Sequence, residues 1–215
     1  MMIPMPQPRA QARCMIKGSD VRQADYPIAP LFLDRWSPRA MSGEAIPQRE
    51  LMTLFEAARW APSSYNLQPW RILYAHRDSA NWPLYFDLLI ESNKAWARNA
   101  AVLLVLVSRK LNDKTGQPSR THSLDTGAAW AFLALQGAAK GFAVHGMQGF
   151  DYARAQTDLN IPEDYAIEMM VAIGKPGSRE SLPPKLQERE LPSDRRKLSE
   201  TAFEGKWTDR GAKGP

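Results

Sequence analysis

Hydrophobic residues recur at helical spacing in four parts of the chain. After Pro47 they come three and four residues apart, at Leu51, Leu54, Phe55 and Ala58, which predicts a helix that Pro62 ends. The same spacing predicts helices over residues 82–92 and 152–159. The longest predicted helix covers residues 123–141, where a serine precedes the apolar run and a glycine follows it. Small residues occupy nearly all of its faces, which indicates burial in the centre of the fold or against a second subunit.

Short runs of hydrophobic and β-branched residues lie between these helices. They predict strands over residues 71–77, 100–107, 142–145 and 166–173, with a loop over residues 145–149. The alternation of the two kinds of element predicts a mixed α/β domain. Beyond residue 177 no hydrophobic periodicity remains, so the tail is either disordered or packs on something outside the domain body. We therefore divide the chain into an N-terminal extension (1–24), for which flexibility is one option, a domain (25–176) and a C-terminal arm (177–215).

Length and composition narrow the class of protein. A chain of 215 residues can bury about 70% of the surface that its unfolded form exposes, so it needs no disulfides for stability. The single cysteine, Cys14, excludes an intramolecular disulfide, and with only three histidines we expect no metal site. A reducing compartment, the cytoplasm, suits this composition. The longest apolar run, residues 100–107, is much shorter than the roughly 20 residues of a membrane-spanning helix, so we expect no membrane segment.

The formal net charge of +5 comes from the two ends of the chain. Residues 1–24 hold four basic residues against one acidic residue, and residues 175–215 hold ten against seven. The middle of the chain is therefore close to neutral. A basic protein suggests a polyanionic partner, and two basic arms that bind nucleic acid remain a third, less favoured hypothesis. We expect no nucleic-acid partner because no basic surface on the domain itself is evident.

Several common catalytic motifs are absent from the sequence. There is no phosphate-binding G-x-x-x-x-G-K-[ST] loop, no G-x-G-x-x-G after a strand, no G-x-S-x-G elbow and no H-E-x-x-H. His122 and Asp125 lie three residues apart where a helix begins, a spacing that suits a base and the residue that orients it. A pair that caps the helix start is the preferred interpretation.

The segment Arg35-Trp36-Ser37-Pro38-Arg39 places two guanidinium groups on either side of a hydroxyl group. Planar arginine donors together with a serine hydroxyl suit a phosphate monoester, which carries about 1.5 to 2 negative charges. The alternative is a solvated basic surface in front of a helix.

Residues 61–70, A-P-S-S-Y-N-L-Q-P-W, form a second candidate. Two prolines restrict the backbone, while hydroxyl and carboxamide groups suit a neutral heteroaromatic ring or a polyol; these groups belong to Ser63, Ser64, Asn66 and Gln68. The alternative is a rigid turn with Trp70 in the core.

Two further features follow near the C-terminal half. In residues 146–151, G-M-Q-G-F-D, two glycines allow close approach of a ligand to the backbone, although such a segment is also typical of a strand-to-helix turn. The run Arg195-Arg196-Lys197 is ordinarily a solvated charge cluster.

Taken together and in this order, the four features resemble the FMN-dependent nitroreductase family. Its members typically carry R-x-S-x-R, then a helix that leads into A-P-S-S-x-N-x-Q-P-W, and G-F-D after the long helix. The resemblance extends from about Leu31 to Gly174 and less securely to Trp207. It implies an α+β fold with a central, mostly antiparallel sheet flanked by helices, in a homodimer whose C-terminal arm packs on the partner subunit.

The resemblance also implies roles for individual residues. Arg35 and Ser37 would help hold the FMN phosphate, and Arg39 would lie near the pyrimidine edge of the flavin. Trp36, between them, is a further cofactor-binding candidate, although many relatives have a second basic residue there. Arg195 or Arg196 would return from the tail to the phosphate. The backbone N–H groups of Gln148 and Gly149 would face flavin N5 and O4. The neighbouring subunit would supply Pro62, Ser63, Ser64 and Asn66, and Gln68 is a further cofactor-binding candidate. Asn93 is the nearest candidate for a further ligand from the middle of the chain.

The activity implied is transfer of electrons from NADH or NADPH through FMN to a small electron-poor acceptor, such as a nitroaromatic compound or a quinone, by a ping-pong mechanism. No catalytic side chain is expected, because the flavin carries the chemistry. Two alternatives remain: an FMN-binding protein without NAD(P)H turnover, which would act as a carrier or sensor, and a specialised flavin oxidase or dehalogenase.

Overall fold

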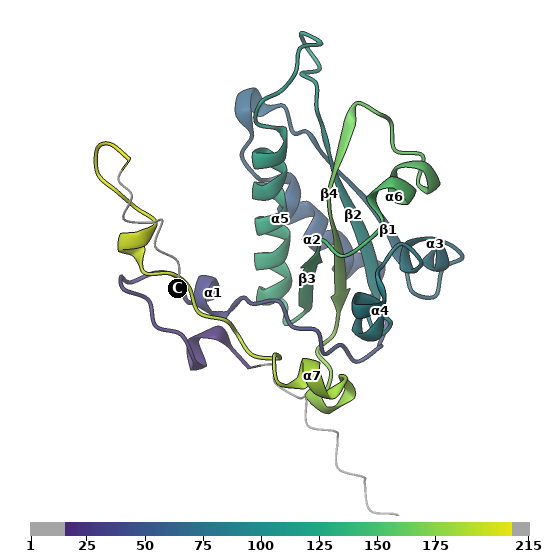
Figure 1. Ribbon diagram of the computed structural model, residues 1–215, viewed down its shortest axis with the longest axis vertical. Helices are drawn as coiled ribbons and strands as arrows, with labels where there is room; N and C mark the ends of the chain where they lie inside the picture. Colours follow the sequence, from purple (N-terminus) through teal and green to yellow (C-terminus); the bar gives the residue numbers. More distant parts are fainter. Residues whose placement is uncertain (1–15, 208–215) are drawn as a thin grey trace, which may run out of the picture.

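A computed structural model describes residues 16–207 of the chain (Figure 1). Cys14 and the first fifteen residues of the predicted N-terminal extension lie outside the described residues. No helix within residues 16–207 is long and apolar enough to cross a membrane.

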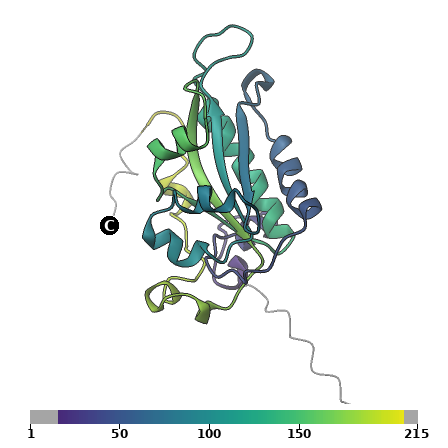
Figure 2. The ribbon, with the colours of Figure 1, turned by 90° about the vertical axis from the view of Figure 1, so that its right-hand side faces the viewer.

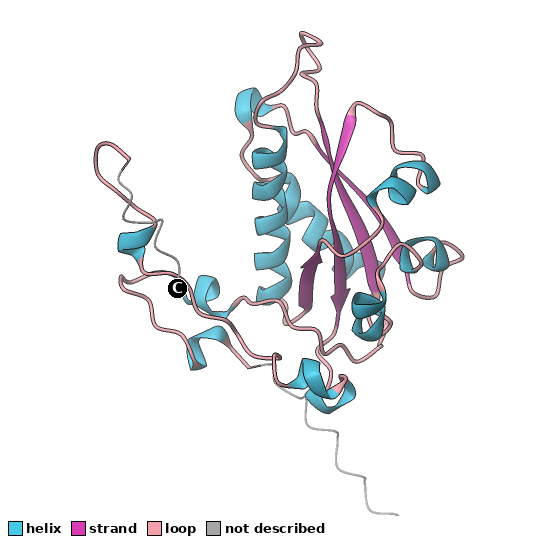
Figure 3. Cartoon of the chain, in the orientation of Figure 1, coloured by secondary structure: helices cyan, strands magenta, loops and turns pink. Residues whose placement is uncertain are grey.

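One antiparallel sheet of four strands forms the centre of the fold (Figure 3). The strands are β1 (Trp70–His76), β2 (Val102–Arg109), β3 (Ala143–Met147) and β4 (Tyr165–Gly174), in the order β1-β2-β4-β3. All three pairings are antiparallel. The predicted antiparallel sheet is therefore confirmed, and its central strand β2 is the buried Val- and Leu-rich run.

Helices cover both faces of the sheet (Figure 2). One face carries α2 (Gln48–Arg59) and the long α5 (His122–Ala139), as predicted. The other carries α3 (Trp82–Phe86), α4 (Glu91–Ala97) and α6 (Tyr152–Asp158). Two short helices, α1 (Pro30–Asp34) and α7 (Pro184–Gln187), lie towards the ends of the chain.

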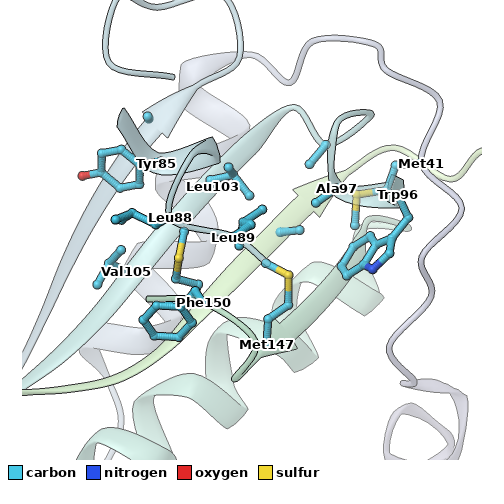
Figure 4. Packing of buried hydrophobic residues seen from close by; sticks show 14 of the residues in the cluster. Met41, Tyr85, Leu88, Leu89, Trp96, Ala97, Leu103, Val105, Met147 and Phe150 are labelled. Atoms are coloured by element: carbon cyan, nitrogen blue, oxygen red, sulfur yellow. The ribbon is translucent and has the colours of Figure 1, made fainter. Parts of the chain in front are cut away.

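The alternation of side chains along β2 divides the core into two clusters. Leu103 and Val105 face the cluster under α3, α4 and α6, which Figure 4 shows with Trp96 and Phe150. Val102 and Leu104 face the other cluster, under α2 and α5. Both faces of β2 are thus buried, which explains why its sequence is continuously apolar rather than alternating.

Two sequence predictions were wrong in detail. The single helix predicted over residues 82–92 is instead two helices, α3 and α4, separated by residues 87–90. Leu88 and Leu89 are both buried, and Leu89 forms an isolated β-bridge with Phe150, so the chain leaves the helical path there. The loop predicted over residues 145–149 is also too long, because residues 145–147 pair with β4 as the end of β3.

The first part of the predicted C-terminal arm packs on this chain's own domain. Leu182 belongs to the core cluster, and the Glu190 side chain is buried against the chain's own residues 39 and 40. Beyond this point the tail runs beside the N-terminal segment (Figure 1), and Arg22 donates a hydrogen bond to the Ser193 carbonyl. Packing of the remaining tail on a partner subunit stays a prediction.

Candidate functional site

A pocket of about 350 Å³ lies where the segment 35–39 meets the tail. Arg35 ends α1 with an extended backbone, and residues 35–39 continue without helical structure beside the pocket. Five arginines contribute to the lining, together with a histidine, two serines and two apolar side chains: Arg22, Arg35, Trp36, Ser37, Arg39, His145, Arg189, Leu191, Ser193 and Arg195. The pocket therefore gathers positive charge from three distant parts of the chain.

Little of this charge is neutralised by the protein. Within the described residues the only carboxylate at salt-bridge distance from a pocket arginine is that of Glu190, 3.9 Å from Arg39 Nη1. Burial, and then the charges of Arg195 and Arg22, lower the pKa of Arg35. Because arginine stays charged in proteins, this mutual repulsion is relieved by binding an anion. The Ser37 hydroxyl, 3.4 Å from Arg35 Nη1, adds a neutral donor at the same place.

His145, on β3, is a neutral member of the pocket. Its Nδ1 lies 3.2 Å from the Pro38 carbonyl oxygen, which can only accept, so Nδ1 carries the proton. Burial, and then the charges of Arg39 and Arg35, lower the pKa of His145 to about 4. The ring also packs against Trp96, with centroids 4.7 Å apart. His145 thus holds the backbone of the arginine segment without adding charge at neutral pH.

A second, more apolar pocket of about 480 Å³ adjoins the first. Arg35 and Ser37 line both pockets. The remaining walls come from α1, α5 and the sheet: Phe32, Trp130, Ala131, Ala134, Leu135, Gly146 and Met169. An anion site and an apolar pocket that share two residues suit a ligand with a phosphate at one end and a ring system at the other.

The loop after α2 is tightly constrained. Tyr65, Asn66 and Gln68 have φ values of +50°, +56° and +48°, a left-handed conformation that costs free energy in residues other than glycine. The Ser63 hydroxyl accepts from the Gln68 N–H at 3.1 Å, and buried Asp125 accepts from the Ser64 N–H at 3.2 Å. The loop is therefore held in one shape by α5.

This loop does not join either pocket within one chain. None of its predicted site residues lines them, namely Pro62, Ser63, Ser64, Asn66 and Gln68. Their contribution from a neighbouring subunit stays a prediction.

Gln148 and Gly149 directly follow β3, as the sequence predicted. Within residues 16–207 neither N–H donates a hydrogen bond, while the Gly149 carbonyl accepts from Ile90 N at 3.1 Å and from Asn93 Nδ2 at 3.0 Å. A Cβ on Gly149 would lie 2.6 Å from Ile90 Cδ1 and 2.7 Å from Asn93 Nδ2, so a larger residue would push these side chains aside. Asn93 therefore supports this turn from α4. The two N–H groups have no protein acceptor among the described residues, but neither Gln148 nor Gly149 lines either pocket.

The tail arginines differ in their placement. Arg195 lines the arginine pocket, whereas Arg196 does not. The sequence could not choose between these neighbours. Trp36 is buried and donates its indole N–H to the Ile16 carbonyl at 2.8 Å, so it anchors the N-terminal segment beside the pocket.

Other residues near the site were missed or misinterpreted from the sequence. His122 and Asp125 do not form a pair: His122 Nδ1 lies 2.7 Å from the Ser108 hydroxyl, and Asp125 contacts the loop instead. In the sequence, Arg22 and Arg189 stand out only as part of the basic excess at the two ends of the chain, and Glu190 belongs to no recognised motif. No local signal marks such residues, because their roles arise from contacts with residues far away in the sequence.

Comparison with known proteins matches the part of the chain that holds the arginine segment, the loop after α2 and the sheet. The sequence model of the Nitroreductase family matches residues 33–94 and 88–175. An NADH dehydrogenase of Thermus thermophilus is 29% identical over 174 residues, 67% of this chain and 84% of that protein. Protein DrgA of a Synechocystis strain is 30% identical over 162 residues, 61% of this chain and 77% of that protein.

Solved structures extend the likeness to the fold. The crystal structure of an oxidoreductase containing FMN is 48% identical to this chain and superimposes with a TM-score of 0.85. That match covers 90% of this chain and 99% of the other. The α+β arrangement described above is thus shared with this oxidoreductase almost from end to end.

Proposed function

Because this chain belongs to the nitroreductase family, we propose that it is an oxidoreductase that binds FMN and passes electrons from NADH or NADPH to a small electron-poor acceptor. Nitroaromatic compounds and quinones are the acceptor classes. The arginine pocket beside the apolar pocket is the observation that carries the proposal. The FMN of the 48% identical oxidoreductase supports the choice of cofactor.

The residues present fit FMN. An arginine cluster without matching carboxylates suits the phosphate, which carries about 1.5 to 2 negative charges at neutral pH. The apolar walls of the neighbouring pocket suit a ring system, and the N–H groups of Gln148 and Gly149 are donors without a protein acceptor among the described residues. A site for a phosphate, a site for a ring and unused donors are the three things that FMN needs.

When bound, FMN supplies the redox chemistry, namely acceptance of hydride from NAD(P)H and delivery of electrons to the acceptor. The chain's own residues would bind FMN and orient it. Arg35, Ser37 and Arg195 would hold the phosphate, and Gln148 and Gly149 would offer N–H groups to the polar edge of the ring. His145 holds the backbone at Pro38 and stays neutral at pH 7, so it adds no charge to the site. The donor and the acceptor would use the same site in turn, which gives ping-pong kinetics.

We also propose that the protein acts as a homodimer. One side of α5 presents an apolar stripe to solvent, and no charged residue lies on it: Leu124, Gly127, Ala128, Ala131, Phe132 and Leu135. Leu124, at the N-terminal end of this stripe, is 74% exposed, which is unusual for a leucine. A second copy on this stripe would cover it and bring another constrained loop 63–68 towards the pockets.

Flavin retention and turnover test the proposal together. Protein purified gently in the presence of FMN should carry a flavin absorption band, and mixing with NADH or NADPH without oxygen should bleach it. A nitroaromatic compound or a quinone should then restore the band. Protein that retains no flavin would contradict the proposed cofactor, whereas bound flavin that neither nucleotide bleaches would favour a carrier or sensor.

A further inference from the structure

The arginine pocket consists of two halves that lie far apart in the sequence. Arg35, Ser37 and Arg39 form one half on the segment after α1, and Arg189, Leu191, Ser193 and Arg195 form the other on the tail. Both halves are rich in like charge, so electrostatic repulsion pushes them apart in the absence of an anion. Polar contacts between the halves must therefore hold the pocket together.

Glu190 makes one such contact, from the middle of the tail half. Its Oε1 accepts from the backbone N–H groups of Arg39 and Ala40, at 2.6 Å and 2.7 Å. The residue is only 4% exposed, and its Oε2 has no hydrogen-bond partner among the described residues. Two charge-assisted hydrogen bonds from a buried carboxylate give a strong link, and the link ends beside a pocket arginine.

Arg22 makes the other contact, from the N-terminal segment. Its Nε donates to the Ser193 carbonyl at 2.7 Å, and its Nη1 donates to the carbonyls of Leu33 and Arg35, both at 3.0 Å. This arginine thus joins the tail to the same segment on the opposite side from Glu190. Arg22 is also a cation in the pocket, so its removal would weaken anion binding for two reasons at once.

We propose that Glu190 is a positioning residue for the cofactor phosphate: it docks the tail on the segment 35–40, so that Arg189 and Arg195 complete the pocket. The proposal rests on the proposed function for the identity of the anion. Glu190 is the informative residue because its charge has the wrong sign for the ligand. If only its charge mattered, its removal would strengthen phosphate binding, whereas loss of docking weakens it.

Three substitutions separate position from charge. Glu190→Ala removes both hydrogen bonds and the charge. Glu190→Asp keeps the charge but shortens the side chain by one methylene, so the carboxylate no longer reaches both N–H groups. Glu190→Gln keeps an acceptor oxygen at the same reach and removes the charge. Glu188→Ala is the matched control, because Glu188 is an exposed carboxylate two residues away with no side-chain hydrogen bond among the described residues.

FMN affinity is the first readout, measured from the quenching of flavin fluorescence on titration with flavin-free protein. We expect Glu190→Ala and Glu190→Asp to raise the FMN dissociation constant about tenfold or more, the scale of a charge-assisted hydrogen bond. Glu190→Gln keeps an acceptor oxygen in place, so it should bind FMN more tightly than Glu190→Ala and Glu190→Asp, and Glu188→Ala should match the wild type.

Tail docking is the second readout, independent of flavin chemistry. Trypsin should cut after the tail arginines faster in Glu190→Ala and Glu190→Asp than in the wild type, and FMN or inorganic phosphate at high concentration should slow the cleavage. Should Glu190→Ala fail to fold, Glu190→Asp carries the same prediction.

The outcomes separate the two proposals. Wild-type affinity in both Glu190→Ala and Glu190→Asp, or tighter binding by them, would overturn the role of Glu190 and leave the proposed function intact. A wild type that binds no FMN would contradict the proposed function instead. In that case the protease measurement with inorganic phosphate tests the docking role, and equal cleavage of the wild type and the Glu190 variants would contradict it.

Discussion

Single side chains decide the charge of the pocket. Arg35, Arg189 and Arg195 have no carboxylate at salt-bridge distance within the described residues, and Arg39 shares Glu190 with two backbone N–H groups. His145 is kept neutral in the same place by burial and by its arginine neighbours, which lower its pKa to about 4. The free protein therefore holds uncompensated positive charge in the arginine pocket.

The two neighbouring tail arginines should differ in their effect on FMN binding. Arg195 lines the pocket and Arg196 does not, so Arg195→Ala should weaken FMN binding by about tenfold or more, the scale of a hydrogen bond to a charged group. Arg196→Ala removes the same charge one residue away. It should change the affinity less than threefold, because only a screened long-range attraction to the phosphate is lost. Titration of both flavin-free variants with FMN gives the comparison. Equal effects of the two substitutions would contradict the placement of Arg195.

The neutral state of His145 should make the protein less stable in mild acid. Because the folded pKa is about 4 and the unfolded value is 6.5, the unfolded chain takes up a proton first as the pH falls below 6.5. The free energy of unfolding should therefore drop by about 2 kcal/mol from this group between pH 7 and pH 5. His145→Gln can still donate to Pro38 and does not titrate, so it should lack this component. Urea unfolding of both proteins at pH 7 and pH 5 measures how far the free energy of unfolding drops in each. An equal drop in the wild type and in His145→Gln would contradict the lowered pKa of His145.

At the scale of elements, the close approach of α5 to the sheet positions the site. Gly137 on α5 lies against β3, where a Cβ would come within 2.4 Å of Val144 Cγ2 and 3.5 Å of Leu54 Cδ2. Asp125, near the N-terminal end of the same helix, holds the loop by accepting a hydrogen bond from the Ser64 N–H. One helix thus carries the apolar pocket wall, the constrained loop and the exposed stripe, so a shift of α5 would disturb all three.

Adding a methyl group at Gly137 should destabilise the protein. Alanine favours a helix by about 1 kcal/mol over glycine, but overpacking against the buried Val144 costs about 1 to 3 kcal/mol. We expect Gly137→Ala to lower the free energy of unfolding by about 1 kcal/mol. Gly127→Ala is the matched control on the same helix, since its Cβ would meet nothing within 4 Å in this chain. Because Gly127 lies on the α5 stripe, both variants are compared in the Leu124→Glu background. Thermal unfolding of both variants checks the prediction, and a gain in stability at position 137 would contradict it.

At the scale of the whole molecule, the proposed homodimer would complete the site. The two pockets contain no residue of the loop 63–68, and the α5 stripe is exposed at Leu124, Gly127, Ala131 and Phe132. A homodimer accounts for both observations at once, because a second copy on the stripe would bury it and bring its own loop near the pockets. The dimer is therefore the proposal on which the complete site depends.

A charge on the α5 stripe should dissociate the dimer and release flavin. Leu124 is 74% exposed in one chain, so Leu124→Glu should leave the folded monomer intact, while two buried carboxylates at an interface would cost several kcal/mol. We expect the dimer dissociation constant to rise by about 100-fold or more and flavin content to fall with it. Leu84→Glu, on α3 across the sheet, is the control and should remain dimeric. Analytical ultracentrifugation decides, and a dimeric Leu124→Glu variant would remove the stripe from the interface.

Local sequence patterns determined most of the elements and the position of the arginine segment. The spacing of apolar residues correctly predicted α2, α5, α6 and all four strands, because hydrophobic period and backbone preference depend on neighbouring residues. The same locality explains the misplaced helix at residues 82–92. Leu89 turns towards Phe150, a partner 61 residues away that no local pattern reveals.

Only the tertiary structure decided how the pocket is assembled. The sequence placed Arg35, Ser37 and Arg39 together because they are adjacent in the chain, and it left Arg195 and Arg196 equivalent. Folding brings the tail to the segment 35–40 through Glu190 and Arg22, selects Arg195, and adds His145 from β3. Contacts between residues that are 150 positions apart depend on the path of the whole chain. Arginines from the two ends and from the segment 35–39 therefore form a defined anion pocket only in three dimensions.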